Sequence, residues 1–442
     1  MPPRRAKSPS ARSNEKQTNL SAFDVSADDG SLLHSHFGEA TAAPAPTNKK
    51  GGGILSELSS VFLPEGYPHS VRPEYFRFQC YDTLQAACSY LRNILTTAAI
   101  LRGSGVGDAE ASAAAAAMAW VLRDGVGMFG SLIFSYGVGG GFDRNVKEWR
   151  LFADVINDVG LTLDMLAPLA GRGTGFTMVA ALGAACKTIC GMTAGATRAS
   201  ITAHFALQNN LADVSAKEGA QETAVTLLGL VLGSFLARQL GDSALITWIA
   251  FISLTLLHVW ANWKGVGCLA LATLNVQRAT IVCDDWVKDS TLRYPFETAT
   301  RESPLGPLYL SLRGPRLGVS ISALIDAKSD ADGGAAALRA LNRIFDGEEF
   351  LLRVGRDGRV CIALRPGATG ATLLKALLCC SWLAARERTP GLQLDELQAL
   401  HEAKERTANA WPLWKGELLK CGWEEAAVRL DHAGAMRVVV EA

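Results

Sequence analysis

Charged side chains lie between two long apolar segments in the stretch from Asn209 to Thr223, which reads NNLADVSAKEGAQET. An ionised group taken out of water without a partner is strongly disfavoured, so these side chains must pair, reach water or line a polar cavity. On a helix, Asp213 and Lys217 are four residues apart and can pair, whereas Glu218 and Glu222 repel each other unless a cation, a proton or a basic residue intervenes. The pattern favours a bundle of helices with a polar interior.

Further polar residues recur in several apolar segments instead of gathering in one loop, as expected when facing helices assemble a polar interior. The candidate functional or structural polar cluster comprises Arg123, Asp124, Arg198, Asn209, Asn210, Asp213, Lys217, Glu218, Gln221 and Glu222. Adjacent residues do not share a helix face, so we expect Arg123 and Asp124 to pair with other helices rather than with each other. For the cluster as a whole we favour structural ion pairing over catalysis, and we assign no catalytic residue.

The composition is typical of a membrane protein or of a deeply buried helical bundle. Hydrophobic residues make up 49% of the chain and charged residues only 19%, whereas charged residues are usually about a quarter of a soluble domain. The 43 basic and 43 acidic residues cancel, so no overall field attracts nucleic acid, and we predict no nucleic-acid partner.

The ten cysteines contain no CxxC pair and no Cys/His spacing of a zinc site. Buried thiols in a reducing, intracellular compartment explain them best. We therefore predict no metal site. The GxGxG at residues 171–175 follows no evident strand, so it gives little support to dinucleotide binding. The sequence leaves the cofactor unknown.

Two apolar segments are the strongest candidates for membrane spans. Residues 243–263 carry no formal charge and have Trp248, Trp260 and Trp263 near their ends, as interfacial anchors would be. Residues 224–237 are shorter and end before Arg238, so burial inside the protein is the alternative to spanning. Glycines four residues apart, as at 229 and 233, permit close helix packing.

An amphipathic helix is predicted over residues 143–164. Its buried side comprises Trp149, Leu151, Phe152, Val155, Ile156 and Val159. Its other side carries Arg150, Asp154 and Asp158 at four-residue spacing, which favours a solvated, salt-bridged face. An interfacial helix on a membrane is the competing interpretation.

The fold class predicted is mainly α: a membrane-like helical bundle with small-residue packing, followed by a small α+β C-terminal domain. Residues 1–53 are predicted to be a disordered tail, 54–302 the helical core with candidate spans, and 303–442 the α+β domain. In the last part we expect short strands at 308–312, 318–322 and 436–440, a hairpin of 350–354 with 359–364, and helices at 335–345, 369–385, 394–410 and 412–421.

The tail has no apolar region of the kind found in secretory signals, and its early arginines are followed by Asp24, Asp28 and Asp29. A solvated tail is favoured over an organellar transit peptide. We therefore expect an intracellular membrane protein, with a plastid or another organelle as an open alternative.

Four long motifs carry a family resemblance. They are FLPEGYPHSVRPEYFRFQCYDTLQA from Phe62, WVLRDGVGMFG from Trp120, KEWRLFADVINDVG from Lys147 and NNLADVSAKEGAQET from Asn209. In this order they resemble the RUS (root UV-B sensitive) family, over roughly residues 62–442. The resemblance implies a link to UV-B responses, early development and vitamin B6 homeostasis, and association with a second copy or with another RUS family member. It implies no known reaction or catalytic residue.

Two classes of function follow. The favoured one is a non-enzymatic, membrane-associated scaffold or carrier that acts through its charged helical interior. The alternative is an enzyme or metabolite-binding protein that uses Asp213, Lys217, Glu218 and Glu222, since paired carboxylates can do acid–base chemistry or hold a hard cation. On either view, Lys217→Ala or Glu222→Ala is expected to be more harmful than changes at Glu148 or Asp164.

Overall fold

The computed structural model describes residues 22–25, 32–35, 54–104, 113–138, 141–171, 173–240, 243–325, 334–355, 357–387 and 395–424. The chain divides into two compact units, Met1–Tyr67 and Pro68–Ala442. In the first unit, strands β1 (Ala22–Val25) and β2 (Leu32–Ser35) pair antiparallel, and helix α1 spans Ile54–Phe62. Both strands lie within the segment for which we predict disorder, and that disorder stays a prediction.

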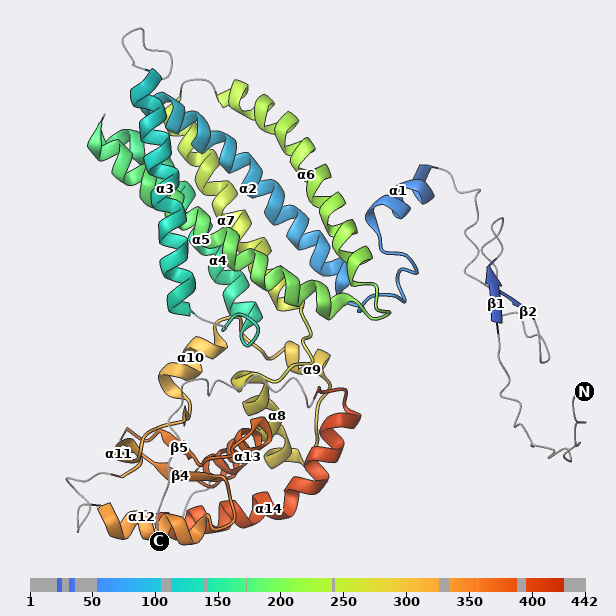
Figure 1. Ribbon diagram of the computed structural model, residues 1–442, viewed down its shortest axis with the longest axis vertical. Coiled ribbons are helices and arrows are strands. Elements are labelled where there is room, and N and C mark those ends of the chain that lie inside the picture. Colours follow the sequence, from blue (N-terminus) through green and yellow to red (C-terminus); the bar gives the residue numbers. More distant parts are fainter. Residues whose placement is uncertain are drawn as a thin grey trace, which may run out of the picture. The chain divides into compact units, whose positions relative to one another are not determined.

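The second unit begins with a bundle of long helices that lie side by side (Figure 1). They are α2 (Tyr75–Gly103), α3 (Ala113–Val138), α4 (Val146–Leu166), α5 (Thr174–Phe205), α6 (Leu211–Leu240) and α7 (Ala244–Cys268), with a short 3-10 helix, η1 (Ala167–Ala170), after α4. Helix α4 packs against α5, and α2 packs against α7 and α6. The predicted mainly α bundle is confirmed.

Helix α6 runs without a break for 30 residues, so the charged segment and the apolar segment 224–237 form one helix. No proline interrupts this stretch, and its charged residues fall in the first half, except Arg238 in the last turn. Three helices are long and apolar enough to cross a membrane: Thr174–Phe205, Leu211–Gln239 and Ala244–Cys268. The third contains the predicted span 243–263 almost entirely.

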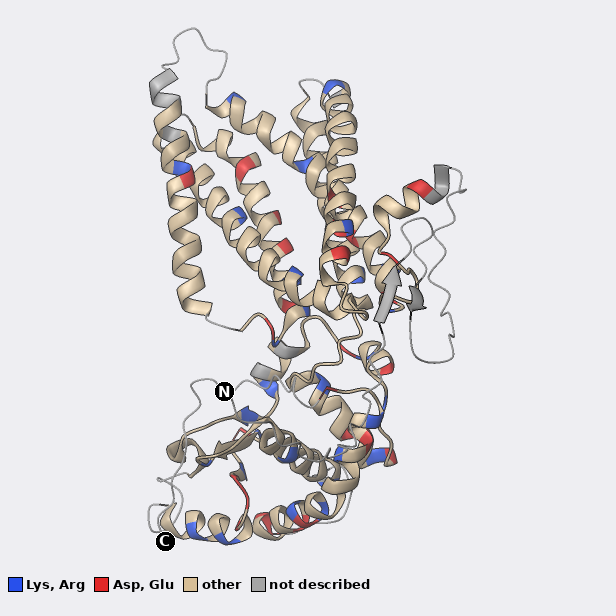
Figure 2. Ribbon diagram, turned by 45° about the vertical axis from the view of Figure 1, so that its right-hand side comes forward, with Lys and Arg blue, Asp and Glu red and all other residues tan. Residues whose placement is uncertain are grey.

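The outer surface of the bundle is apolar. Large hydrophobic side chains are exposed along α3, α6 and α7, including Phe129, Leu132, Leu228, Phe235, Ile249 and Leu256. In Figure 2 the helices of the bundle are mostly tan, whereas charged residues recur along the long helix at the bottom of the view, in the C-terminal region. A contiguous apolar exterior of this kind marks a surface that contacts lipid or protein.

Helix α4 shows the same inversion and corrects one expectation. Asp154 and Asp158 are 5% and 7% exposed, whereas Val155 and Val159, assigned above to the buried side, are 42% and 43% exposed. The predicted solvated polar face is therefore wrong. The polar residues of this helix point into the bundle. Leu151 is buried as predicted, at 6% exposed, whereas Val155 and Val159 point outward.

The C-terminal region is a small α+β core. It comprises α8 (Val276–Asp289), α9 (Pro295–Ala299), α10 (Gly306–Arg313), β3 (Arg316–Leu317), α11 (Ile321–Leu324), α12 (Ala335–Ile344), β4 (Phe350–Val354), β5 (Val360–Leu364), α13 (Gly370–Glu387) and α14 (Glu396–Lys420). The sheet order is β3-β5-β4, with β3 parallel and β4 antiparallel to β5. The predicted α+β region is confirmed.

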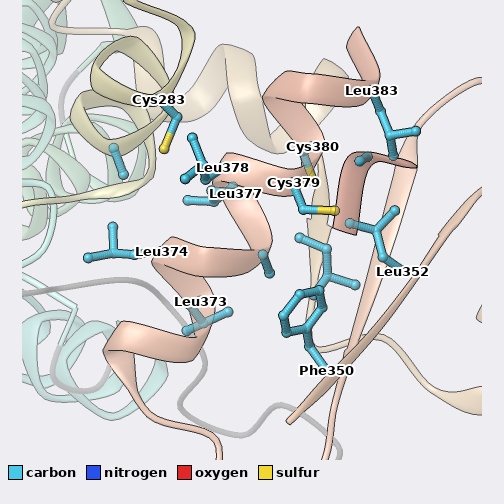
Figure 3. Close-up of a cluster of buried hydrophobic side chains, with 14 of the residues drawn as sticks. Cys283, Phe350, Leu352, Leu373, Leu374, Leu377, Leu378, Cys379, Cys380 and Leu383 are labelled. Carbon is cyan, nitrogen blue, oxygen red and sulfur yellow. The ribbon is translucent and has the colours of Figure 1, made fainter. Parts of the chain in front are cut away.

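Helix α13 is buried around most of its circumference and fills this core (Figure 3). Leu373, Leu377 and Cys380 belong to the same buried cluster as Phe350 on β4 and Cys283 on α8. Because α8 contributes to this core, C-terminal packing starts before the predicted boundary at residue 303. The boundary itself stays a prediction.

The local elements predicted for the C-terminal region are confirmed in part. The hairpin of β4 and β5 and the helix at 335–345 are confirmed, and Gly358 supplies the left-handed turn residue with φ +72°. The strand predicted at 308–312 is wrong, because this segment is helix α10, which has proline in its first turn. Strand 318–322 is also wrong, and α14 continues through Pro412 instead of ending there. Residues 436–440 lie outside the described residues.

Candidate functional site

A polar cavity of about 410 Å³ lies between α2, α4, α5 and α6, and it is partly open to the outside, since Arg198 and Glu222 in its lining are 41% and 55% exposed. Charged side chains line it from all four helices: Asp82, Arg150, Asp154, Arg198, Glu218 and Glu222. Gly191 and Gly195 form part of its wall on α5, and a Cβ atom added at either glycine would meet nothing within 4 Å. The absence of side chains at these positions keeps the cavity open.

One side of the cavity is organised by Arg198 on α5. Its Nη1 donates to Glu222 Oε2 at 2.6 Å, and its Nε lies 3.7 Å from Glu218 Oε2. Glu218 also accepts hydrogen bonds from Thr202 Oγ1 at 2.8 Å and Gln79 Nε2 at 3.3 Å. Of the three partners that the spacing of Glu218 and Glu222 allows, which are a cation, a proton and a basic residue, the structure has the basic residue.

The opposite side is organised by Arg150 on α4. Its Nη2 donates to Asp82 Oδ1 at 2.9 Å, and its Nε lies 3.5 Å from Asp154 Oδ2. Gln85 Nε2 donates to Asp154 Oδ1 at 2.8 Å. The sequence pattern predicts a solvated face for Arg150 and Asp154, which is wrong, and it singles out neither Asp82 nor Gln85. The four-residue spacing of polar residues along α4 does indicate a polar face, but this face points into the bundle instead of toward solvent.

A buried network continues from Gln85 to α7. His258, which is fully buried, has its Nε2 at 3.3 Å from Gln85 Nε2 and its Nδ1 at 3.1 Å from Asp158 Oδ2. Arg92 is also fully buried, and its Nη1 donates to Asp158 Oδ1 at 2.5 Å and to Thr255 Oγ1 at 3.3 Å. The sequence did not single out His258, because one histidine in an apolar segment is usually an ordinary buried residue.

Beyond this network, the interior of the bundle contains two apolar clusters, together with the buried carboxylate Asp164, which is paired with Lys187 of α5. Leu95, Ala99, Leu161, Met165 and Phe251 form one buried cluster, and Ile100, Ala167, Phe176 and Ala180 form another. Along α2, the polar side chains from Gln79 to Arg92 thus give way to the apolar ones from Leu95 to Ile100. We call these two clusters the apolar plug, because they fill the bundle interior beyond the polar part.

The remaining predicted cluster residues lie in three places. Gln221 lines the cavity. Asp213 and Lys217 form the expected pair at 3.9 Å, and Asn210 donates to the Ser70 carbonyl at 3.2 Å. Asn209 adopts φ 55° just before α6. These last residues order the start of α6 and are not among those that line the cavity.

Arg123 and Asp124 lie on α3, away from the cavity lining. The Arg123 guanidinium lies 4.5 Å from the centre of the Trp120 ring, and its Nε lies 4.0 Å from Asp124 Oδ1. The two neighbours thus lie at the outer limit of an ion pair with each other, which was not expected, while the charge of Arg123 also acts on Asp164 of another helix, α4. Because Arg123 folds back over Trp120, its head lies close enough to the next residue.

A second buried ion network links the bundle to the C-terminal region. Glu302 Oε2 lies 2.6 Å from Lys147 Nζ at the start of α4, and Glu302 Oε1 accepts from Arg278 Nη1 on α8 at 2.6 Å. Burial alone would raise the pKa of Glu302, but the two cations outweigh it and lower the pKa from its usual value. Asn275 Nδ2 adds a hydrogen bond to Asn145 Oδ1 at 3.1 Å. This junction holds α4 against α8.

No group of three or more His, Cys, Asp or Glu residues in the described part of the chain is arranged to hold a metal ion. The arrangement instead offers hydrogen-bond donors, hydrogen-bond acceptors and charges of both signs around a small cavity. Such a site can orient and bind a polar molecule.

Comparison with known proteins identifies the family. Residues 48–290 match the model of the vitamin B6 photo-protection and homoeostasis domain. The protein root UVB sensitive 3 of Arabidopsis thaliana is 40% identical over 280 residues, which are 61% of this chain and 63% of that protein. RUS family member 1 of Dictyostelium discoideum is 40% identical over 262 residues, which are 59% of this chain and 50% of that protein.

The match thus spans less than two thirds of the length of these two relatives. The protein root UVB sensitive 2, chloroplastic, of Arabidopsis thaliana is 29% identical over 332 residues. No solved structure matches the chain. The family model covers α2 to α7 and therefore the cavity and the buried network. The chain belongs to the RUS (root UV-B sensitive) family.

Proposed function

We propose that this protein is a membrane-embedded carrier that binds a small polar solute in the charged cavity of its bundle. The observation that carries this proposal is the inverted polarity of the bundle. Ionised side chains are rare in membrane helices, face the bundle interior where they occur, and mark solute or ion pathways. Here Arg92 and Asp158 are inside, whereas Leu228 and Leu256 are exposed.

The cavity and the apolar plug together favour a carrier over an open channel. A polar site of about 410 Å³ is large enough for a small metabolite. Since the plug fills the interior beyond the polar part, a solute at the site would pass only when the helices rearrange. Such alternating access is the usual behaviour of carriers with a site between helices.

The paired state of the carboxylates favours binding over acid–base catalysis. Glu218 and Glu222 share Arg198, and Asp82 and Asp154 share Arg150. A carboxylate held by an arginine is fixed in position, which suits recognition of a polar solute. The description of the family model names vitamin B6 homoeostasis, so pyridoxine and pyridoxamine are the first solutes to test.

Membrane embedding is tested by alkaline carbonate extraction of the tagged full-length chain. We expect it to stay in the membrane pellet, and we expect Leu256→Lys, on the outward face of α7, to reduce the integrated fraction. A lysine at the centre of a membrane helix costs about 2.5–3.5 kcal/mol on insertion scales. Leu419→Lys on α14 is the control, since Leu419 is also exposed but lies in the C-terminal region. Release of the unaltered chain into the supernatant would contradict the proposal.

Solute transport is tested by uptake of tritiated pyridoxine and pyridoxamine into proteoliposomes. Gly195→Leu places a side chain in the cavity, and we expect at least tenfold slower uptake. Gly125→Leu is the matched control, because Gly125 is an exposed glycine in the interior of α3 with nothing within 4 Å of an added Cβ. Equal uptake by both variants, or none by the unaltered protein, would contradict the carrier proposal for these solutes.

A further inference from the structure

An exposed group of large apolar side chains lies on and around α9 and α10, in the C-terminal region. Its members are 45–67% exposed: Tyr294, Phe296, Leu305, Leu308, Tyr309 and Leu312. Leu308 and Leu312 are four residues apart on α10 and therefore share one face of this helix. Most large apolar side chains of this region are buried in one core, so an exposed group of them marks an interaction surface. We call residues 291–316 the α9–α10 segment.

The α9–α10 segment is joined to one end of the bundle. Glu302, between α9 and α10, is paired with Lys147 at the start of α4, and the charge of Lys147 also acts on His204 near the end of α5. His204 Nε2 lies 2.8 Å from Glu74 Oε1, and the N–H of Ala270, just after α7, donates to the same carboxylate at 3.3 Å. Helices α9 and α10 thus lie next to the end of the bundle where α2 and α4 begin and α5 and α7 end (Figure 1). We call it the junction end.

The exposed tyrosine and tryptophan side chains that the structure describes in the bundle lie toward this junction end. Tyr136, near the end of α3, is 93% exposed, and Trp260 and Trp263, near the end of α7, are 48% and 40% exposed. The end of α3 belongs to the junction end because α4 begins shortly after it. Tyrosine and tryptophan favour the depth of the lipid headgroups, since each ring is apolar and carries one polar group. Tyr294 and Tyr309 add two such side chains on the α9–α10 segment.

The same segment is basic. Residues 291–316 contain four arginines and two glutamates, and one of these glutamates is buried in the junction. Arg313, the last residue of α10, has no carboxylate partner in the described part of the chain. Arg293 and Arg301 share the single buried carboxylate of Asp285, which leaves one positive charge in excess. Arginines beside exposed aromatic and leucine side chains are typical of surfaces that bind anionic lipid headgroups.

We propose that the α9–α10 segment lies on the membrane surface, with Leu308, Tyr309 and Leu312 among the lipid headgroups and Arg313 against anionic ones. This inference rests on the membrane embedding proposed above, and it adds a lipid contact that holds the C-terminal region against the membrane at the junction end. A lipid bilayer accounts for the apolar exterior of the bundle, for the aromatic side chains of the junction end and for the basic segment together. A protein partner would account for the segment alone.

The first test is photo-cross-linking of the full-length chain in vesicles made of equal parts of phosphatidylcholine and phosphatidylglycerol. The photoreactive residue benzoylphenylalanine replaces Leu308, and in the matched control it replaces Leu397, an exposed leucine in the first turn of α14. The other end of α14 is the one near the segment, since the Trp423 ring N–H donates to the Arg293 carbonyl at 2.9 Å. Leu397 is about 35 Å from that end along the helix.

An interfacial helix buries its apolar face among headgroups and acyl chains, so we expect about fivefold more lipid adduct at position 308 than at position 397. Equal amounts of lipid adduct at the two positions would overturn the proposal. An adduct between position 308 and a second copy of the chain, in place of lipid, would also overturn it, because protein would then cover the segment.

The second test concerns the charge of the lipid. Each basic residue close to an anionic surface strengthens the attraction about fivefold, so Arg313→Gln is expected to reduce the lipid adduct at position 308 by up to this factor in the mixed vesicles. Arg339→Gln, which alters an exposed arginine on α12, is the matched control and should leave the adduct unchanged. The same amount of adduct in vesicles of phosphatidylcholine alone as in the mixed vesicles would overturn the assignment to anionic lipids.

Alkaline carbonate extraction separates the failure of this proposal from the failure of membrane embedding. If the chain stays in the pellet and position 308 does not react with lipid, the embedding stands and the lipid contact of the α9–α10 segment is overturned. If carbonate releases the chain although position 308 reacts with lipid beforehand, the embedding is overturned and the segment binds the membrane from outside.

Discussion

Helix α7 places His258 fully inside the bundle and Leu256, two residues earlier, 68% exposed on its outside. In the C-terminal region the arrangement is the opposite: Leu352 on β4 is fully buried, and ion pairs such as that between Arg316 and Asp357 are exposed. The two interiors therefore differ, and a membrane around the bundle, as we propose, would account for the difference. In water the hydrophobic effect drives apolar side chains inward, whereas in lipid it gives no such preference and polar groups must find partners inside.

The largest expected effect comes from breaking the buried ion pair of the bundle. Arg92→Met keeps most of the side-chain volume but leaves Asp158 without its arginine, and removing one partner of a buried pair costs about 3–5 kcal/mol. Thermal unfolding of the detergent-solubilised protein, followed by tryptophan fluorescence, measures the loss. The double variant Arg92→Met/Asp158→Asn should recover part of it, and simple additivity of the two changes would show that the pair is not coupled.

The same substitution in the two regions gives the most direct comparison. Leu352→Ala empties space in the C-terminal core and should cost about 2–5 kcal/mol. Leu256→Ala removes an exposed side chain and should change stability by less than about 0.5 kcal/mol in detergent. Urea unfolding of both variants provides the measurement. A large loss at Leu256 would mean that the outward face of α7 is covered by protein, and the contrast between the two interiors would disappear.

The junction between the two regions should be sensitive to acid. Because the folded-state pKa of Glu302 lies below its usual value, its ion pairs stabilise the fold fully above the unfolded-state pKa, and this stability is lost as pH falls through the folded pKa. Each unit of difference corresponds to about 1.4 kcal/mol. The melting temperature between pH 7 and 3 should fall less for Glu302→Gln than for the unaltered protein. If the melting temperatures of the two proteins fell in parallel as the pH was lowered, Glu302 would not contribute to the acid sensitivity.

Much of the fold was predictable because, in many segments, the local sequence pattern and the surroundings of the element favour the same secondary structure. Asp357-Gly358 between β-prone runs predicts the hairpin of β4 and β5, and the uncharged stretch 243–263 predicts α7. The prediction of a strand at 308–312 was wrong because a short apolar run suits either a strand or a helix. The proline at the start of α10 favours the helix.

The candidate site was predicted only on the side of α5 and α6. The spacing of Glu218 and Glu222 requires a basic partner, and Arg198 fills that role. The opposite wall was missed because periodicity shows that α4 has a polar face and an apolar face, but it does not say which one points inward. In water the polar face points outward, and in a membrane the assignment is reversed. Arg150, Asp154 and Asp158 were assigned by the first rule.

The smallest expected effect is that of Lys217→Ala, a position that the sequence ranks as more sensitive than Asp164. Lys217→Ala removes a half-exposed pair with Asp213, and such i,i+4 pairs contribute about 0.3–0.5 kcal/mol. Asp164→Ala should cost clearly more, because Asp164 is 2% exposed and is paired with Lys187 from α5. We therefore expect Asp164 to be the more sensitive position, contrary to the expectation from sequence. Melting temperatures of the two single variants are the measurement, with Asp213→Ala as the control for Lys217. If Lys217→Ala were the more harmful change while Asp213→Ala had no effect, Lys217 would act outside its pair, and the cluster at the start of α6 would regain the functional role for which the sequence singled it out.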